Sequence, residues 1–145
     1  MNTNELLAMI GSNLNSENVQ TFLNQNSSFE EFLSETDIYK ISYNLGLDLL
    51  FRENKLDSIF LYSEGKDGHK EYSGDVPLNM QFYSNRKELV SANKPERTWK
   101  IGQGQVDITF SEPSHDRWAF DSYTISAHYS KKTKVIMYFI IRKNA

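Results

Sequence analysis

Residues 39–62 read YKISYNLGLDLLFRENKLDSIFLY, and this stretch decides the class of the fold. Apolar residues occupy every second position over 39–43 and again over 47–51, which is the period of a β-strand with one buried face. Residues 53–55 are few enough for a hairpin connection, after which the apolar run 56–62 returns as the next strand. We therefore predict an antiparallel meander of three strands over residues 39–62.

The sequence before this meander has helical spacing. Thr3 is the predicted cap of a first helix, whose apolar residues follow the i, i+1, i+4 spacing of one helix face. Ser16 is the predicted cap of a second short helix, with Glu17 in its first turn, where the helix dipole favours a carboxylate. Two helices this short must pack on a larger element, and the sheet provides it.

The second half of the chain predicts one more helix and three more strands. Ser84 or Asn85 caps a short helix that ends before Pro95. Strands are expected over 105–110, 118–129 and 134–142, and the apolar run 135–141 belongs in mid-sheet with both faces covered. The prediction is a single α+β domain over residues 1–145. Its N-terminal helix pair and short mid-chain helix pack on one face of a twisted antiparallel sheet of about six strands.

Charge is unevenly distributed along the 145 residues, whose formal net charge is -3. Residues 1–39 hold six acidic residues and no Lys or Arg, whereas residues 131–145 hold five basic residues and no acid. Two solvated faces of opposite sign account for this pattern. A patch of one sign can also steer the encounter with a partner of opposite charge. The overall acidity argues against a dedicated nucleic-acid-binding protein, which normally carries a basic domain.

Composition excludes several kinds of site. The chain has no Cys, which excludes disulfides, thiolate nucleophiles and zinc sites built on sulfur. Its three histidines do not stand in a metal-binding spacing, so we expect neither a metal nor a cofactor. No apolar run approaches the ~18–20 residues of a membrane span, and residues 1–15 lack the pattern of a secretory signal. We expect a cytoplasmic protein with no membrane association.

The histidines offer little support for catalysis. His69 and His115 are predicted to lie in solvated loops, and His128 on the less buried face of a strand. A metal-free ribonuclease needs a base, a second acid and a cation, and His115, Glu112 and Arg117 could supply them. Nothing in their spacing favours that arrangement, and aromatic residues over 118–129 are more typical of a core than of a base-stacking surface. Because the residue types are nevertheless present, a small metal-independent nuclease or hydrolase is kept as an alternative.

Residues 39–97 contain a longer ordered pattern. In sequence it reads Gly46-Leu47-x-Leu49-x-Phe51, Leu56-x-x-Ile59-Phe60-Leu61-Tyr62, Tyr72-x-Gly74-x-Val76-Pro77-Leu78-x-Met80-x-Phe82, then Arg86, Glu88-Leu89 and Lys94-Pro95. This resembles the pattern G-[IL]-x-L-x-F, L-x-x-I-x-L-Y, Y-x-G-x-L-P-x-G-L-x-F-x-x-S-R-x-E-V, L-G-x-P of small bacterial immunity proteins from polymorphic-toxin and contact-dependent growth-inhibition systems. Asn79 and Asn93 replace two of the family's glycines. Because Asn is the residue other than Gly that best accepts a positive φ, we expect a positive φ at both positions.

The resemblance implies a function in binding rather than in catalysis. An immunity protein binds and neutralises a cognate toxin domain by stoichiometric occlusion in the cytoplasm, so no small-molecule substrate and no direct nucleic-acid contact are expected. Where the toxin is a nuclease with a basic cleft, an acidic surface would steer association. On that hypothesis the predicted partner-binding residues are Glu30, Glu31, Glu35 and Asp37, in the segment without bases. A general protein-binding adaptor is a second alternative.

Overall fold

The computed structural model describes residues 2–26, 28–82 and 84–144. It contains three α-helices, two 3-10 helices and nine strands within these residues. In chain order the elements are α1 (Thr3–Met9), α2 (Glu17–Gln25), β1 (Glu30–Ser34), β2 (Asp37–Ser42), β3 (Leu47–Arg52), β4 (Lys55–Tyr62), η1 (Lys66–Gly68), η2 (Pro77–Asn79), α3 (Arg86–Ala92), β5 (Arg97–Lys100), β6 (Gly104–Val106), β7 (His115–Ala119), β8 (Tyr123–Tyr129) and β9 (Ile136–Lys143).

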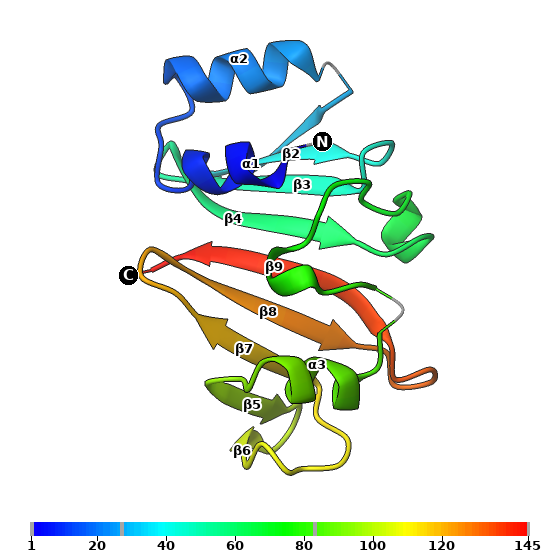
Figure 1. Ribbon diagram of the computed structural model, residues 1–145. Coiled ribbons are helices and arrows are strands. Elements are labelled where there is room, and N and C mark those ends of the chain that lie inside the picture. Colours follow the sequence, from blue (N-terminus) through cyan, green and yellow to red (C-terminus); the bar gives the residue numbers. More distant parts are fainter. Residues whose placement is uncertain (1, 27, 83, 145) are drawn as a thin grey trace.

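The strands form one antiparallel sheet in the order β1-β2-β3-β4-β9-β8-β7-β5-β6. β1 to β4 follow one another as a meander, and the C-terminal strand β9 returns to the centre between β4 and β8 (Figure 1). The α+β class and the meander over 39–62 are confirmed. The central place of the apolar run 135–141 is confirmed as well, but its two faces are not both covered as predicted, since Met137 and Tyr138 are only half-buried.

The helices cover one face of this sheet. Strand residues that are directly opposite share a face, and the pairs Leu61↔Phe139 and Ile59↔Ile141 lie on the covered one. These residues form a single buried cluster with apolar side chains of all three helices, namely Leu6 and Met9 of α1, Val19 and Phe22 of α2, and Leu89 of α3. Within the described residues none of the three α-helices lies on the other face, which is called the open face below (Figure 1).

The sheet has nine strands where about six were predicted. β1 is an exposed edge strand without alternating burial, so it lacks the pattern that identifies a strand. The expected strand 118–129 is two strands, β7 and β8, which are antiparallel neighbours. The expected strand 105–110 is reduced to β6. β5 was not predicted, because its four residues are too few to show a clear alternation of apolar and polar types.

Backbone details correct two further predictions. Asn2, not Thr3, caps α1 by accepting a hydrogen bond from the amide of Asn4, whereas Asn85 caps α3 as expected. Asn79 has φ +56°, as predicted, but Asn93 has φ −146° in extended backbone. The α3 helix therefore ends without a left-handed residue.

Candidate functional site: an acidic hairpin at the edge of the sheet

The β1–β2 hairpin forms one edge of the sheet. β1 pairs only with β2 in the described sheet, so the outer side of its backbone is unpaired. All five of its residues are exposed. Phe32 and Leu33 are 59% and 64% exposed, which is unusual for large apolar side chains in a strand. An exposed strand edge with apolar side chains is a surface on which another chain can pair.

The four acidic residues predicted from the sequence all lie on this hairpin. Glu30 and Glu31 begin β1, Glu35 lies in the turn with φ +54°, and Asp37 begins β2. Successive strand residues point to opposite faces, so Glu30 shares a face with Phe32 and Glu31 shares the other with Leu33. The structure therefore brings the four carboxylates to one edge but not onto one face.

Two of these carboxylates are paired with bases. Glu31 accepts a hydrogen bond from Lys40 Nζ at 3.1 Å, and Asp37 lies 3.5 Å from Nε of Arg52. Both ion pairs are partly exposed to solvent, and such surface pairs contribute little to stability. Sequence reasoning missed Phe32 and Leu33, although two large apolar residues between acidic ones were a visible signal.

His69 is buried, so its predicted place in a solvated loop is wrong. Its side chain is 3% exposed, and its Nε2 lies 2.8 Å from Oδ1 of Asp48. Asp48 also accepts a hydrogen bond from the Tyr62 hydroxyl at 2.8 Å. His69 Nδ1 lies 2.9 Å from the Lys66 carbonyl oxygen, so both ring nitrogens are engaged. Burial and the Asp48 carboxylate raise the pKa of Tyr62 above its ordinary value. This cluster holds the 63–72 connection against the sheet.

Of the three residues of the alternative catalytic hypothesis, His115 and Arg117 both contact the ring of Trp99, whereas Glu112 has a different partner. Glu112 pairs with Lys134 at 2.5 Å, and Arg117 lies over the ring of Trp99. His115 begins strand β7 instead of lying in a loop, and its Nδ1 lies 3.1 Å from the Ser114 hydroxyl. Burial lowers the pKa of His115, while neighbouring Asp116 raises it less.

A row of stacked rings crosses the open face. His115 lies between Trp99 and His128, with centroid distances of 4.8 and 4.7 Å, and His128 stacks on Tyr138 at 4.5 Å. Burial, then the neighbours His115 and Arg142, lower the pKa of His128 to about 3. His115 and His128 therefore each have a neighbouring ring on both faces. The aromatic residues Trp118 and Tyr129 are buried, which confirms their prediction as core.

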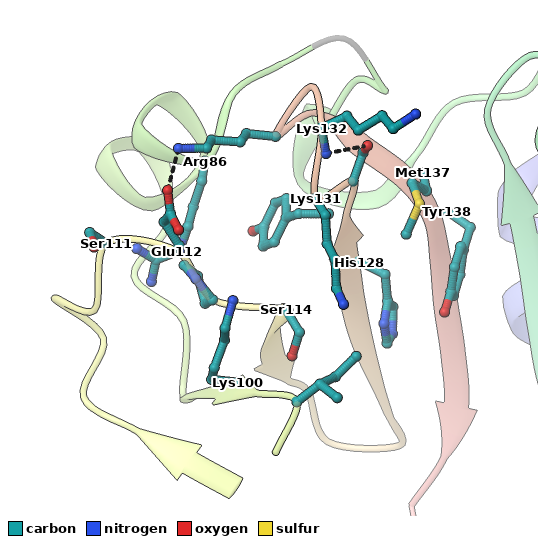
Figure 2. Close-up of a pocket in the computed structure, with 15 residues that line it drawn as sticks. Arg86, Lys100, Ser111, Glu112, Ser114, His128, Lys131, Lys132, Met137 and Tyr138 are labelled. Atoms are coloured by element: carbon teal, nitrogen blue, oxygen red, sulfur yellow. Dashed lines mark hydrogen bonds and ion pairs between the residues drawn. The ribbon is translucent and has the colours of Figure 1, made fainter. Parts of the chain in front are cut away.

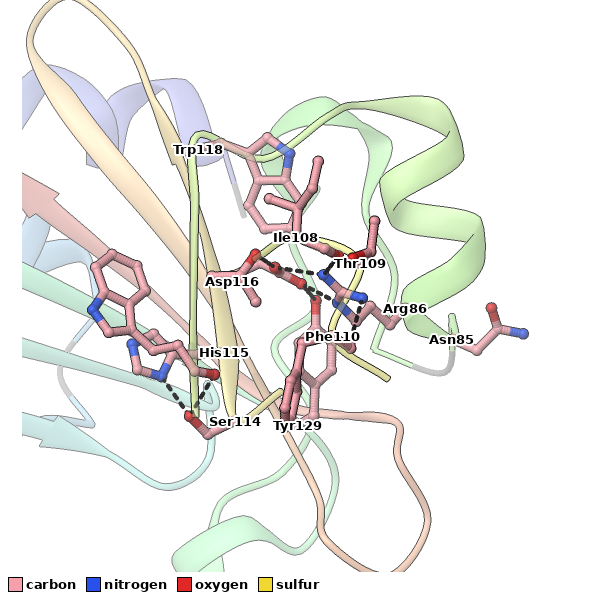
Figure 3. A network of polar contacts seen from close by, with 12 residues as sticks. Asn85, Arg86, Ile108, Thr109, Phe110, Ser114, His115, Asp116, Trp118 and Tyr129 are labelled. Carbon is pink, nitrogen blue, oxygen red and sulfur yellow. Dashed lines mark hydrogen bonds and ion pairs between the residues drawn. The ribbon is translucent and has the colours of Figure 1, made fainter. Parts of the chain in front are cut away.

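The most buried ionic group joins α3 to the sheet (Figure 3). Asp116 is fully buried and accepts hydrogen bonds from Arg86, from the Thr98 hydroxyl at 2.5 Å and from the Tyr129 hydroxyl at 2.6 Å. Arg86 also donates to the carbonyl oxygens of Ile108 and Phe110. The network fixes the loop after β6 and the position of α3.

Within residues 2–26, 28–82 and 84–144, no three metal-ligating side chains converge. No helix among these residues is long and apolar enough to cross a membrane. No protein-family model matches the chain, and no curated protein matches it.

Solved structures that share the fold include two bacterial proteins. One is an extracellular protein containing an SCP domain from Bacillus anthracis str. Ames, with a TM-score of 0.64 and 11% identity over 96% of this chain and 45% of that one. The other is a cysteine-rich secretory protein from Staphylococcus aureus subsp. aureus Mu50, with a TM-score of 0.59 and 5% identity over 94% of this chain and 44% of that one. The likeness is one of fold. This chain spans less than half the length of either protein.

Proposed function

We propose that this protein is an immunity protein that binds a cognate toxin domain in the cytoplasm and neutralises it by occlusion. The resemblance of residues 39–97 to immunity proteins supplies the class of partner. The observation that carries the proposal is the β1–β2 hairpin, where a wholly exposed edge strand presents Phe32 and Leu33 between carboxylates.

The chemistry of the hairpin suits a basic protein partner. Large apolar side chains supply the buried centre of an interface, and charged groups around them set the rate and orientation of encounter. Phe32 and Leu33 point to opposite faces of β1, so a partner that grips the edge can contact both. The unpaired backbone of β1 can add main-chain hydrogen bonds to a strand of that partner.

Co-expression tests the function directly. The gene beside this one is expressed alone and together with this chain, and growth and co-purification are measured. We expect the neighbouring product to arrest growth alone, and this chain to restore growth and to co-purify with it in a fixed ratio. A neighbouring product that is harmless, or that is still toxic when this chain is present in excess, would reject the proposal.

Charge substitution tests the surface. The variant E30Q/E31Q/E35Q/D37N removes the four carboxylates of the hairpin, and E17Q/E64Q/E71Q/D121N removes four exposed carboxylates elsewhere. The hairpin variant should associate with the toxin domain more slowly, by about tenfold at low salt, and with a flatter dependence on salt. If the two variants slow association equally, the net charge of the protein and not the position of these carboxylates on the hairpin sets the association rate.

A general binding module is the second candidate. The shared fold with proteins more than twice as long, described as extracellular and as secretory, favours it. Cell fractionation and a search for the bound partner distinguish an immunity protein from a general binding module. An immunity protein should be found in the cytoplasmic fraction, and its partner should be the toxic product of the neighbouring gene. Robust turnover of a nucleic acid by the purified protein, abolished by His115→Ala, would instead establish the enzymatic alternative.

A further inference from the structure

A second surface lies beside the β8–β9 hairpin, in the other half of the sheet from β1. A pocket of about 450 Å³ opens there, between the hairpin and the segments around residues 100 and 111–114 (Figure 2). A volume of this size is within the range that holds small organic ligands.

The rim of the pocket is cationic. Lys100 at the end of β5 and Lys131 and Lys132 in the β8–β9 turn line it. Figure 2 shows Lys100 and Lys131 reaching toward the same space, whereas the Lys132 side chain points away from them. Within the described residues none of these three ammonium groups has an acid within 4.0 Å. The one lining acid, Glu112, is already neutralised by Lys134.

The walls of the pocket are mainly apolar. Pro113 is buried, and Met137 and the ring of Tyr138 are half-buried beside it. Ile101 also lines the pocket and is 72% exposed. Ser114 adds a hydroxyl group at the back. Apolar walls with a few polar groups and a charged rim are typical of a site for an amphipathic small molecule.

The backbone around the pocket is fixed by hydrogen bonds. The Lys134 amide donates to the Ser130 carbonyl oxygen at 2.9 Å, which closes the turn that carries the lysines. The Ser114 amide donates to the Trp99 carbonyl oxygen at 2.8 Å, and the Tyr129 amide donates to that of Ser114 at 3.0 Å. The two sides of the pocket are therefore tied together through the sheet, so the site exists before a ligand binds.

We propose that this pocket binds a small organic anion, with an apolar body against Pro113 and Met137 and a carboxylate, sulfonate or phosphate held by Lys100 and Lys131. His128 at the pocket wall is neutral at physiological pH, so the lysines supply the positive charge. The proposal is independent of the toxin-binding function, because the pocket and the β1–β2 hairpin lie in separate halves of the sheet.

Fluorescence titration with a matched pair of probes tests it. Anilinonaphthalene sulfonate has an aromatic body and an anionic group, and N-phenyl-naphthylamine has nearly the same body without the charge. We expect saturable binding of the sulfonate to the full chain, with about fivefold weaker binding to K100Q/K131Q, as two exposed charge contacts of ordinary strength would give. The uncharged probe should bind both proteins alike.

The control variant is K55Q/K70Q, which removes two exposed lysines that do not line the pocket and changes the net charge equally. It should bind the sulfonate as the wild type does, and F32S/L33S should too, since those residues belong to the other surface. Backbone amide NMR shifts on titration should concentrate in residues 100–101, 111–114 and 128–138. Equal loss in both lysine variants, no saturable binding, or shifts centred on the β1–β2 hairpin would overturn the proposal. Full displacement of the sulfonate by inorganic phosphate at equal concentration would overturn the requirement for an apolar body.

Discussion

Arg86 on α3 binds the fully buried carboxylate of Asp116 on β7 through two hydrogen bonds, Nε to Oδ2 at 2.7 Å and Nη2 to Oδ1 at 3.1 Å. The pair is bidentate, and Asp116 also accepts hydrogen bonds from the hydroxyl groups of Thr98 and Tyr129 (Figure 3). It is the main polar link between the mid-chain helix and the sheet. Removing one partner of a buried ion pair leaves the other charge without compensation.

The Asp116→Asn variant should therefore be strongly destabilised. We expect the free energy of unfolding in urea to fall by about 3 kcal/mol, because the partly buried guanidinium of Arg86 loses its counter-charge. E112Q breaks the exposed pair with Lys134 and should leave the urea midpoint nearly unchanged. Similar losses in the two variants would contradict the role given to burial.

Asp48 is expected to stabilise the 63–72 connection. In Asp48→Asn the hydrogen bonds to His69 and Tyr62 are weakened together, so the free energy of unfolding should fall by about 1–3 kcal/mol. Tyr62→Phe removes only one of these bonds and should cost less, about 1 kcal/mol. Urea unfolding measures both, and a larger loss in Y62F than in D48N would contradict this assignment.

His128 should make the protein sensitive to acid. Its folded pKa of about 3 lies below the ordinary value of 6.5, so the unfolded chain binds the proton more readily between these two pH values. Stability is thus unaffected above pH 6.5 and falls as the pH drops from 6.5 toward 3. Between pH 6.5 and 4.5 this linkage amounts to at most about 2–3 kcal/mol.

The comparison of wild type with His128→Asn isolates that effect. The free energy of unfolding is measured for both proteins at pH 7 and pH 4.5. The variant should lose less stability on acidification than the wild type, since its side chain takes up no proton. The same loss in both proteins would show that other groups carry the acid sensitivity.

Gly46 should not tolerate a side chain. It has φ +68°, and a Cβ there would lie 2.1 Å from the Lys70 carbonyl oxygen, so Gly46→Ala adds a backbone clash to the strain of a left-handed residue. We expect a loss of at least about 2 kcal/mol in the free energy of unfolding. Gly102→Ala has φ +87° with open space around the Cβ, so it carries the strain alone and should cost less. Urea or thermal unfolding measures both variants, and an equal loss of unfolding free energy in Gly46→Ala and Gly102→Ala would rule out the clash.

Phe32 and Leu33 should matter for binding and not for folding. Because both are exposed, F32S and L33S should change the free energy of unfolding by no more than about 0.5 kcal/mol. Each should weaken the complex with the toxin domain at least about tenfold, as central apolar contacts of an interface do. Calorimetry of the complex measures the affinity, and an unchanged affinity in both variants would remove the hairpin from the interface.

The strands that could be predicted are those whose apolar residues either alternate or form a dense run. The meander over 39–62 and the central run 135–141 carry their burial in the spacing or density of their apolar residues. β1 could not be found in this way, because all its residues are exposed and its strand conformation comes from pairing with β2. The positive φ of Asn79 was visible from residue type, whereas Asn93 shows that residue type permits this conformation without requiring it.

Sequence alone determined the α+β class, the meander and the acidic character of the first 39 residues, because local periodicity and composition record burial and charge directly. Tertiary structure decided which distant groups meet. Asp48 meets His69, Asp116 meets Arg86, and Lys100 comes to the lysines of the β8–β9 turn. Strand order fixes such contacts, and strand order depends on the packing of the whole chain, which no local spacing encodes.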